Sequence, residues 1–389
     1  MPISSGEAPL TATESSSPVT TDESSAARSR SSAGLPGVVQ SWRRRKPSSS
    51  SRPAQVRRSP VTQVTSGSAP RAPSSSTNCG RAGSSTRDGR GTLPSRTNVN
   101  HVSLLTGTYP ERHGLSANFY YDRATGREVF MDEVAFVREP FLFERARFLG
   151  WTTALVTAKE KLTRLLRTGV DLSIHTTSVP PDLGGTLGPA PDIFSMECNL
   201  WVLQAAREVA ARYAPEFLYV ATTDYPEHKL PPDSPEMQQH LRLTDELIGG
   251  ILDLYDPDRD LVVLTADHGM NAKTRSVSPV RLLAEAGISA RGVPLIRDGL
   301  YAHHRDLGGA LYLFVDDPAT VEGAARVLAG APGVDVVIPR SEAGRYHLPA
   351  DRVGEDLRAG RGGALRGPRR GGHGSGEVPG RGVDHRRPH

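Results

Sequence analysis

The 389-residue chain has little cysteine, few aromatic residues and no long apolar run. Its two cysteines, Cys79 and Cys198, are too few for a disulfide framework or for a metal site built from several thiolates. No stretch approaches the roughly 20 apolar residues of a membrane-spanning helix, and the N-terminal region lacks the apolar core of a secretion signal. These absences predict a cytoplasmic protein without a membrane partner.

The few aromatic residues are unevenly distributed. Residues 1–93 are rich in serine and contain Trp42 but no Phe or Tyr, and residues 354–389 are rich in Gly and Arg and have no aromatic residue. Such segments bury too little apolar surface to offset the entropy lost on ordering, so we expect both ends to be disordered. Because GC-rich DNA translated out of frame gives a similar composition, our hypothesis is that both ends are frame-shifted.

Both ends carry a positive excess, whereas the formal net charge of the whole chain is only +4. The residues between them, 94–353, are therefore acidic, and we expect them to form the folded domain. A folded nucleic-acid-binding domain usually presents a basic face. The charge distribution therefore argues against specific nucleic-acid binding, and the run WRRRK (42–46) is interpreted as solvated charge.

Within residues 94–353, strand patterns alternate with helix patterns. Apolar runs rich in β-branched residues predict buried parallel strands at 152–157, 217–223 and 261–265. Helices are predicted at 131–148, 199–213 and 235–255, the last with Ser234 as N-cap. This alternation predicts a mainly parallel sheet with helices on both faces. A separate β-α-β pattern at 310–339 predicts a small cap subdomain.

Polar pairs follow two of the predicted strands, at the carboxyl ends where parallel sheets bind ligands. Asp224 and His228 are four residues apart and share one face of a helical turn, while Asp267 and His268 are adjacent and precede the flexible Gly269. Carboxylate and imidazole without thiolate favour Zn²⁺ over Mn²⁺ or Fe²⁺. The alternatives are a helix N-cap with a surface histidine for the first pair, and a turn-forming aspartate beside a hydrogen-bonded histidine for the second.

Thr97 precedes a predicted helix in TNVNHVSLL, and its hydroxyl is a candidate nucleophile. The helix dipole and free amides at that position favour an anionic phosphoryl group, although threonine is also a common N-cap. His101 and His113, on the following stretch, have no partner pattern and are interpreted as structural.

Three further side chains are candidates for substrate binding. Lys159 and Lys161 lie two residues apart after a predicted strand and either clamp an anion or are solvated. Asn118, in SANFYYD, either donates to a phosphoryl oxygen or is a turn asparagine.

Four stretches, TNVNHVSLLTGTYPERHGLSANFYYD, VTAKEKLTRLL, ATTDYPEHK and LTADHGMNAKT, resemble in this order the alkaline phosphatase superfamily. Within it they resemble the type I phosphodiesterase/nucleotide pyrophosphatase group and, in TTDY-x-x-H-K and TADHGMNAK, most closely the phosphonoacetate hydrolases. The resemblance covers about residues 94–353. It implies an alkaline phosphatase-like α/β fold and an enzyme of phosphonate catabolism that hydrolyses the P–C bond of phosphonoacetate to phosphate and acetate.

The resemblance also implies roles for individual residues. Two zinc ions would be held, one by Thr97, Asp267 and His268 and the other with Asp224 and His228. Thr97 would also be the nucleophile, and the small phosphonate substrate would be bound by Asn118, Lys159 and Lys161. Whether the protein forms a homodimer stays open.

Two ligands of the family pattern are missing from this chain. The pattern has an early aspartate after a strand of the type V-V-V-x-x-D-G and a late histidine in S-H-G-G. Asp88 follows no strand pattern, and no strand pattern lies beside His373, so neither residue is assigned as a metal ligand. Three hypotheses stay open: a zinc-dependent P–C hydrolase, either active or inactivated by the loss of two metal ligands; a phosphodiesterase or nucleotide pyrophosphatase of the same superfamily; and an inactive, non-enzymatic relative.

Overall fold

The computed structural model describes residues 89–270, 277–296 and 309–354, together with the backbone of three short strands at 62–64, 84–86 and 356–360. Contacts divide the chain into Met1–Arg43 and Arg44–His389. The first unit lies outside the described residues, as do Asp88, His373 and most of the two ends predicted to be disordered or frame-shifted.

A three-stranded parallel sheet positions the polar pairs of the sequence. It has the order β6-β5-β7, formed by Leu172–Ile174, Thr153–Thr157 and Phe217–Ala221. Two of the three predicted parallel strands, β5 and β7, are thereby confirmed. Along β5 the buried side chains alternate between the two faces, because Leu155 belongs to one core cluster and Ala154 and Val156 belong to another.

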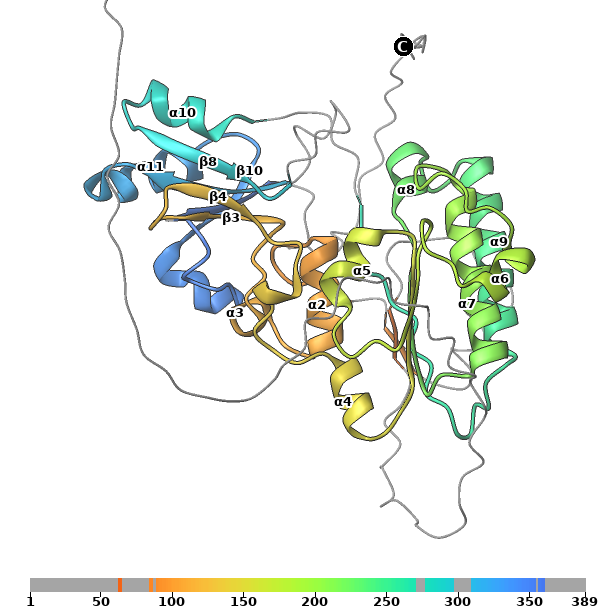
Figure 1. Ribbon diagram of the computed structural model, residues 1–389. Helices are drawn as coiled ribbons and strands as arrows, with labels where there is room; N and C mark the ends of the chain where they lie inside the picture. Colours follow the sequence, from red (N-terminus) through yellow and green to blue (C-terminus); the bar gives the residue numbers. More distant parts are fainter. Residues whose placement is uncertain are drawn as a thin grey trace, which may run out of the picture. The chain divides into compact units, whose positions relative to one another are not determined.

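Helices cover both faces of this sheet, as predicted (Figure 1). The core on the Leu155 face is completed by α2 (Thr97–Thr106), α4 (Leu142–Phe148) and α5 (Glu160–Leu166). The opposite face is covered by α6 (Pro181–Leu187) and α7 (Glu197–Tyr213), and α9 (Pro235–Leu252) packs beside α7.

The helix predictions succeeded where the apolar period was uninterrupted. Helix α7 matches the prediction, and α9 begins after Ser234, whose hydroxyl accepts a hydrogen bond from the Met237 amide at 3.2 Å. The single helix predicted over 131–148 is wrong, because this region contains the 3-10 turn η1 (Val134–Phe136) and the separate helix α4. Pro140 lies between them, and a proline cannot continue a helix that precedes it.

The third predicted strand is wrong. Residues 261–265 are not assigned to a strand, and Leu261 and Val263 are 62% and 58% exposed. A strand is stabilised by pairing with a neighbour, and β5 is the only neighbour of β7 in the described part of the sheet. The second edge of β7 is thus unpaired among the described strands, and the run at 261–265 does not pair with it, so apolar composition alone does not make this segment a strand.

A second sheet contains the predicted β-α-β unit. Its order is β10-β11-β9-β8, and the strands are Val334–Pro339, Asp356–Gly360, Ala310–Val315 and Ala290–Pro294. Helix α11 (Val321–Ala329) connects β9 to β10 and packs with α10 (Pro279–Glu285) on one face (Figure 1). The unit thus belongs to a sheet separate from β6-β5-β7, as predicted.

Strand β11 corrects the prediction that residues 354–389 are disordered throughout. It pairs in antiparallel orientation with both β9 and β10. Strands joined through a helix leave space for a strand between them, and backbone hydrogen bonds along both edges stabilise even the weak strand sequence DLRAG. Similarly, β1 (Thr62–Val64) and β2 (Ser84–Thr86) form a short parallel pair within residues 1–93.

The remaining elements are short. A hairpin of β3 (Phe119–Asp122) and β4 (Arg127–Phe130) contributes to a core with Tyr312 and Met131. The short helices are α3 (Pro110–His113), α8 (Tyr225–Lys229), η3 (Pro318–Thr320) and η4 (Arg340–Tyr346). Among the helices that the structure describes, none is long and apolar enough to cross a membrane.

Candidate active site

Thr97 lies beside the second polar pair. Its Oγ1 is 3.1 Å from His268 Nε2, and His268 Nε2 is 3.3 Å from Asp267 Oδ2. Thr97 is the first residue of α2, and the N-cap position is occupied by Arg96, which makes no side-chain capping bond. The threonine hydroxyl therefore contacts the polar pair across the fold rather than capping its own helix.

The first polar pair forms a second cluster with a lysine. Asp224 Oδ2 is 3.3 Å from His228 Nε2, and Asp224 Oδ1 accepts a hydrogen bond from Lys159 Nζ at 3.2 Å. Burial raises the pKa of the Asp224 carboxyl, but the hydrogen bond from His228 and the charge of Lys159 outweigh it and hold this pKa well below its usual range. Asp224 is the N-cap residue of α8, yet its side chain makes no capping bond. Its carboxylate faces the site as an ionised ligand candidate.

Secondary structure holds this cluster in place. The amide side chain of Asn199 on α7 donates to Thr223 O at 2.8 Å and accepts from Thr223 N at 2.7 Å, which fixes the backbone just before Asp224. Lys159 follows β5, and its amide donates to the fully buried Thr157 hydroxyl at 3.3 Å. The ends of β5 and β7 therefore bring Lys159 and Asp224 together, as expected for adjacent parallel strands.

Sequence reasoning missed His101, which the structure places inside the site. His101 is 8% exposed, its Nε2 is 3.8 Å from Asp267 Oδ2, and its Nδ1 is 2.6 Å from the Tyr219 hydroxyl. Its interpretation as a histidine without a partner is therefore wrong. The available signal was its position four residues after Thr97, which puts both on one face of α2.

Arg96 was also missed. Its Nε is buried and has no hydrogen-bond partner among the described residues. Burial lowers the pKa of its guanidinium to about 10, and the negative charge of Asp224 acts in the opposite direction. A buried cation with an unused donor, directly before Thr97, suits an anionic ligand.

The other two substrate-binding candidates lie near the β3–β4 hairpin. Asn118 immediately precedes β3, and its backbone oxygen accepts from Met131 N at 2.8 Å. Lys161 Nζ lies 4.1 Å from the ring centre of Phe130, the neighbour of Met131. The backbone thus brings both residues to the base of the same hairpin, while Lys159 is held at Asp224.

The donor atoms can be compared with the geometry of zinc. Four ligands about 2.0 Å from a tetrahedral Zn²⁺ lie roughly 3.3 Å from one another. The measured separations of 3.1 Å for Thr97–His268, 3.3 Å for Asp267–His268 and 3.3 Å for Asp224–His228 match this edge length. Among the described residues, however, no group of three or more His, Cys, Asp and Glu side chains is arranged to hold a metal ion. Thr97, Asp267 and His268 could supply three ligands to one ion, since Thr97 and Asp267 each lie at this spacing from His268 Nε2, while Asp224 and His228 could supply two ligands.

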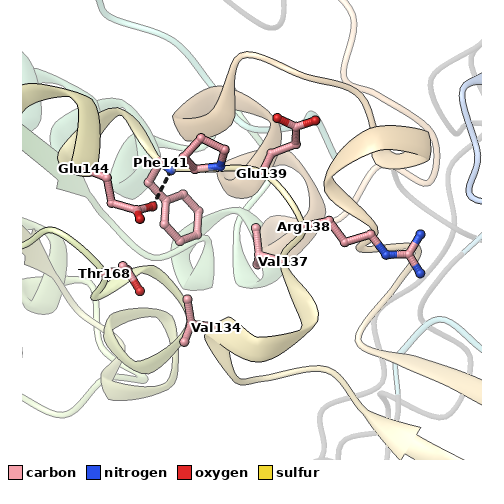
Figure 2. A pocket seen from close by; sticks show the side chains of 8 residues that line it. Val134, Val137, Arg138, Glu139, Phe141, Glu144 and Thr168 are labelled. Atoms are coloured by element: carbon pink, nitrogen blue, oxygen red, sulfur yellow. Dashed lines mark hydrogen bonds between the residues drawn. The ribbon is translucent and has the colours of Figure 1, made fainter.

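A surface pocket lies elsewhere, around the start of α4. Figure 2 shows its lining, which includes Val134, Val137 and Phe141 together with three charged residues. The charged residues already have partners, since Glu139 pairs with Arg112, Arg138 with Asp351, and Glu144 accepts from the Phe141 amide. None of the lining residues belongs to the Thr97 cluster or to the Asp224 cluster, so the pocket is not part of the candidate active site.

The parallel sheet covered by helices, with one polar cluster at the ends of β5 and β7 and another at the start of α2, is that of a protein of the alkaline phosphatase superfamily. More narrowly, the family model for type I phosphodiesterase / nucleotide pyrophosphatase matches residues 81–326, and the chain belongs to this family. This confirms the resemblance seen in the sequence, although the match begins upstream of residue 94.

Similar folds occur among solved structures. Phosphonoacetate hydrolase from Sinorhizobium meliloti 1021, in complexes with phosphonoformate and phosphonoacetate, is similar with a TM-score of 0.64 and 29% identity, over 70% of this chain and 71% of that one. Murine ectonucleotide pyrophosphatase / phosphodiesterase 5 in complex with AMP has a TM-score of 0.50 and 16% identity, over 79% and 80% of the two chains. The latter likeness concerns the fold alone.

Curated relatives include bis(5'-adenosyl)-triphosphatases of vertebrates. The enpp4 enzyme of Mus musculus is 27% identical over 182 residues, which are 45% of this chain and 38% of the relative. The Homo sapiens ENPP4 enzyme is 28% identical over the same shares. The chain thus spans 38% of the length of these relatives.

Proposed function

We propose that the protein is a zinc-dependent hydrolase that cleaves the P–C bond of phosphonoacetate, with Thr97 as the nucleophile. The observation that carries the proposal is the 3.1 Å contact between Thr97 Oγ1 and His268 Nε2 at the N-terminus of α2. The similarity to phosphonoacetate hydrolase supports the choice of substrate. We place the reaction in the cytoplasm with a small phosphonate as the ligand.

Five residues would hold zinc. Thr97, Asp267 and His268 would bind one ion, and Asp224 and His228 would supply two ligands to a second ion whose remaining ligands are not among the described residues. When bound, zinc lowers the pKa of a coordinated hydroxyl and offsets charge on phosphoryl oxygens. The residues of the chain would then bind the phosphoryl group and the carboxylate of the substrate and orient them for the reaction.

Thr97 would form the bond to phosphorus. The first turn of α2 has no side-chain cap, and the buried Nε of Arg96 at its N-cap has no hydrogen-bond partner among the described residues, so both would suit an anionic phosphoryl group at the start of the helix. Thr97 Oγ would lose its proton to solvent as the Oγ–P bond forms. The P–C bond would break at the same time, and the carbon would take the electron pair and then a proton from solvent to give acetate. Water next hydrolyses the phosphothreonine to release phosphate.

Lys159, Lys161 and Asn118 would hold the substrate carboxylate. A carbanion is a poor leaving group, so the negative charge that develops on the acetate portion must be stabilised. Cationic and amide donors near that portion offset the charge in the transition state. Lys159 already sits at the site edge through Asp224.

A second candidate function is hydrolysis of a phosphodiester or a nucleotide pyrophosphate. The observations that favour it are the family model and the vertebrate relatives named as triphosphatases. The same Thr97 cluster would attack phosphorus, with an alcohol or a phosphate as leaving group instead of carbon.

The test compares phosphate release from phosphonoacetate with nitrophenol release from a nitrophenyl phosphodiester, both with added Zn²⁺. The proposal expects turnover of phosphonoacetate that Thr97→Ala abolishes, whereas Thr108→Ala, past the other end of α2, retains it. Faster turnover of the diester would favour the second function. A folded protein that takes up no zinc and turns over neither substrate would support an inactive relative.

A further inference from the structure

Asp267 presents its two carboxylate oxygens to different partners. Oδ1 accepts a hydrogen bond from the His268 amide at 3.0 Å, which fixes one side of the carboxylate to the backbone. Oδ2 lies 3.3 Å from His268 Nε2 and 3.8 Å from His101 Nε2. The oxygen that faces the Thr97 cluster therefore lies between two imidazoles.

His101 is supported from behind by Tyr219. The His101 Nδ1 and the Tyr219 hydroxyl are 2.6 Å apart, and the two rings are nearly perpendicular, at 79°. Tyr219 in turn packs edge-on against Phe143, which is fully buried. The imidazole is thus held between strand β7 and the Asp267 carboxylate by a side chain anchored in the core.

Electrostatics selects one tautomer of His101. The two ring nitrogens have different polar neighbours, with Nε2 toward Asp267 Oδ2 and Nδ1 toward the Tyr219 hydroxyl, so the single hydrogen of a neutral ring has two possible positions. A hydrogen on Nδ1 would leave the Nε2 lone pair facing the negative Asp267 oxygen, which is repulsive. With the hydrogen on Nε2, the ring presents a positive edge to Asp267, and Nδ1 accepts from Tyr219. Burial raises the pKa of the Tyr219 phenol, which keeps the proton that it donates.

We propose that His101 is a positioning residue, and that the chain Tyr219 hydroxyl → His101 Nδ1, His101 Nε2–H → Asp267 Oδ2 aims the Asp267 carboxylate at the Thr97 cluster. The 3.8 Å separation is longer than a direct hydrogen bond, so the interaction is a charge–dipole contact between the Nε2–H edge of the ring and the carboxylate. The inference rests on the proposed function for its consequence in catalysis. The arrangement itself is independent of the substrate.

The first test reads the tautomer directly in the metal-free wild-type protein. Nitrogen-15 NMR of the histidine rings distinguishes a protonated Nε2 from a protonated Nδ1, and the His101 signals are assigned by their loss in His101→Gln. The proposal expects the Nε2–H tautomer in the wild type and in Tyr219→Phe, where Asp267 still faces Nε2, and a mixture of tautomers in Asp267→Ala. A dominant Nδ1–H tautomer would overturn the proposal, whether or not the protein hydrolyses any substrate.

The second test replaces His101 with amide side chains of two different lengths. The amide nitrogen of Gln occupies the place of Nε2 and can donate to Asp267, whereas the shorter Asn reaches only the place of Nδ1. We expect His101→Asn and His101→Leu to weaken Zn²⁺ binding by about 10- to 100-fold, as is typical when the partner of a metal ligand is removed, and His101→Gln to restore most of it. His113→Gln, a buried histidine outside the cluster, is the control and should bind as the wild type.

The two tests separate the inference from the proposed function. If His101→Gln and His101→Asn weaken Zn²⁺ binding equally while both variants keep the wild-type circular dichroism, His101 has only a packing role and the inference fails. If the wild type takes up no Zn²⁺, the proposed function loses its metal, and the tautomer measurement alone decides the positioning role.

Discussion

At the residue scale, burial determines what each histidine of the described fold can do. His113 is fully buried, its Nδ1 accepts from the Leu115 amide at 3.2 Å, and its Nε2 lies 2.8 Å from Ser103 Oγ. Because Nδ1 accepts, the ring hydrogen is on Nε2 and is donated to Ser103. The neutral ring uses both nitrogens, which confirms the interpretation of His113 as structural.

His113 predicts acid sensitivity. Burial lowers its pKa to about 4, whereas an unfolded histidine has a pKa of about 6.5, so between these values the unfolded state binds more protons. The contribution to stability is therefore complete above pH 6.5 and declines as the pH falls toward 4, by at most about 3 kcal/mol. Urea unfolding at pH 7 and pH 5 should show a smaller pH effect in His113→Gln than in the wild type. An equal pH effect in both proteins would contradict the assignment.

The site residues were predictable where they stand at the ends of strands or beside one another. Asp267 and His268 are adjacent, and Asp224 and His228 are one helical turn apart, so each pair can be recognised from its spacing in the sequence alone. Tyr219 and Arg96 gave no such signal, because their roles depend on contacts with Asp267, His101 and Asp224 that only the folded chain creates.

At the element scale, the starts of two helices give a matched pair of variants. Ser234 at the N-cap of α9 accepts from the Met237 amide, while Ser278 at the N-cap of α10 makes no side-chain capping bond. We expect Ser234→Ala to lower the free energy of unfolding by about 1 kcal/mol and Ser278→Ala to leave it nearly unchanged. Denaturant titrations of both variants check this, and equal losses would show that the Ser234 bond contributes nothing specific.

The unpaired run at 261–265 gives a second prediction. Val263 is 58% exposed, whereas Val156 on β5 is fully buried. Val263→Thr should therefore change the free energy of unfolding by no more than about 0.5 kcal/mol. Val156→Thr buries a hydroxyl among apolar side chains and should cost roughly 1–3 kcal/mol. If both substitutions destabilise equally in denaturant titrations, the run at 261–265 is buried after all.

Strand prediction from apolar runs succeeded for β5 and β7 and failed for 261–265, although all three runs have similar composition. Local sequence reports that a segment suits a sheet, but it does not report whether the fold brings that segment alongside another strand. The same reason explains β11, whose sequence is a poor strand yet lies between β9 and β10.

At the scale of the whole molecule, zinc should stabilise the folded state. An ion that binds only the folded protein adds about 2.7 kcal/mol at a free concentration 100 times its Kd. For a fold of this size we expect the thermal midpoint to rise by roughly 5–10 °C, an effect that a chelator reverses. Asp267→Asn should remove most of the rise.

The control for this prediction is Asp122→Asn at the β3–β4 hairpin, where the carboxylate bonds only its own turn in the described contacts. This variant should show the full rise with Zn²⁺. A wild-type midpoint that does not respond to Zn²⁺ would contradict the assigned ligands.

The sequence by itself determined the family and the order of its motifs, together with the residue types available for chemistry, because these depend on short spacings along the chain. The tertiary structure decided which of these residues meet. It brought Thr97 to His268, placed His101 and Tyr219 behind Asp267, and paired Lys159 with Asp224. It also left residues 261–265 outside the described sheet, because a segment becomes a strand only where the fold brings it alongside another strand that completes its hydrogen bonds.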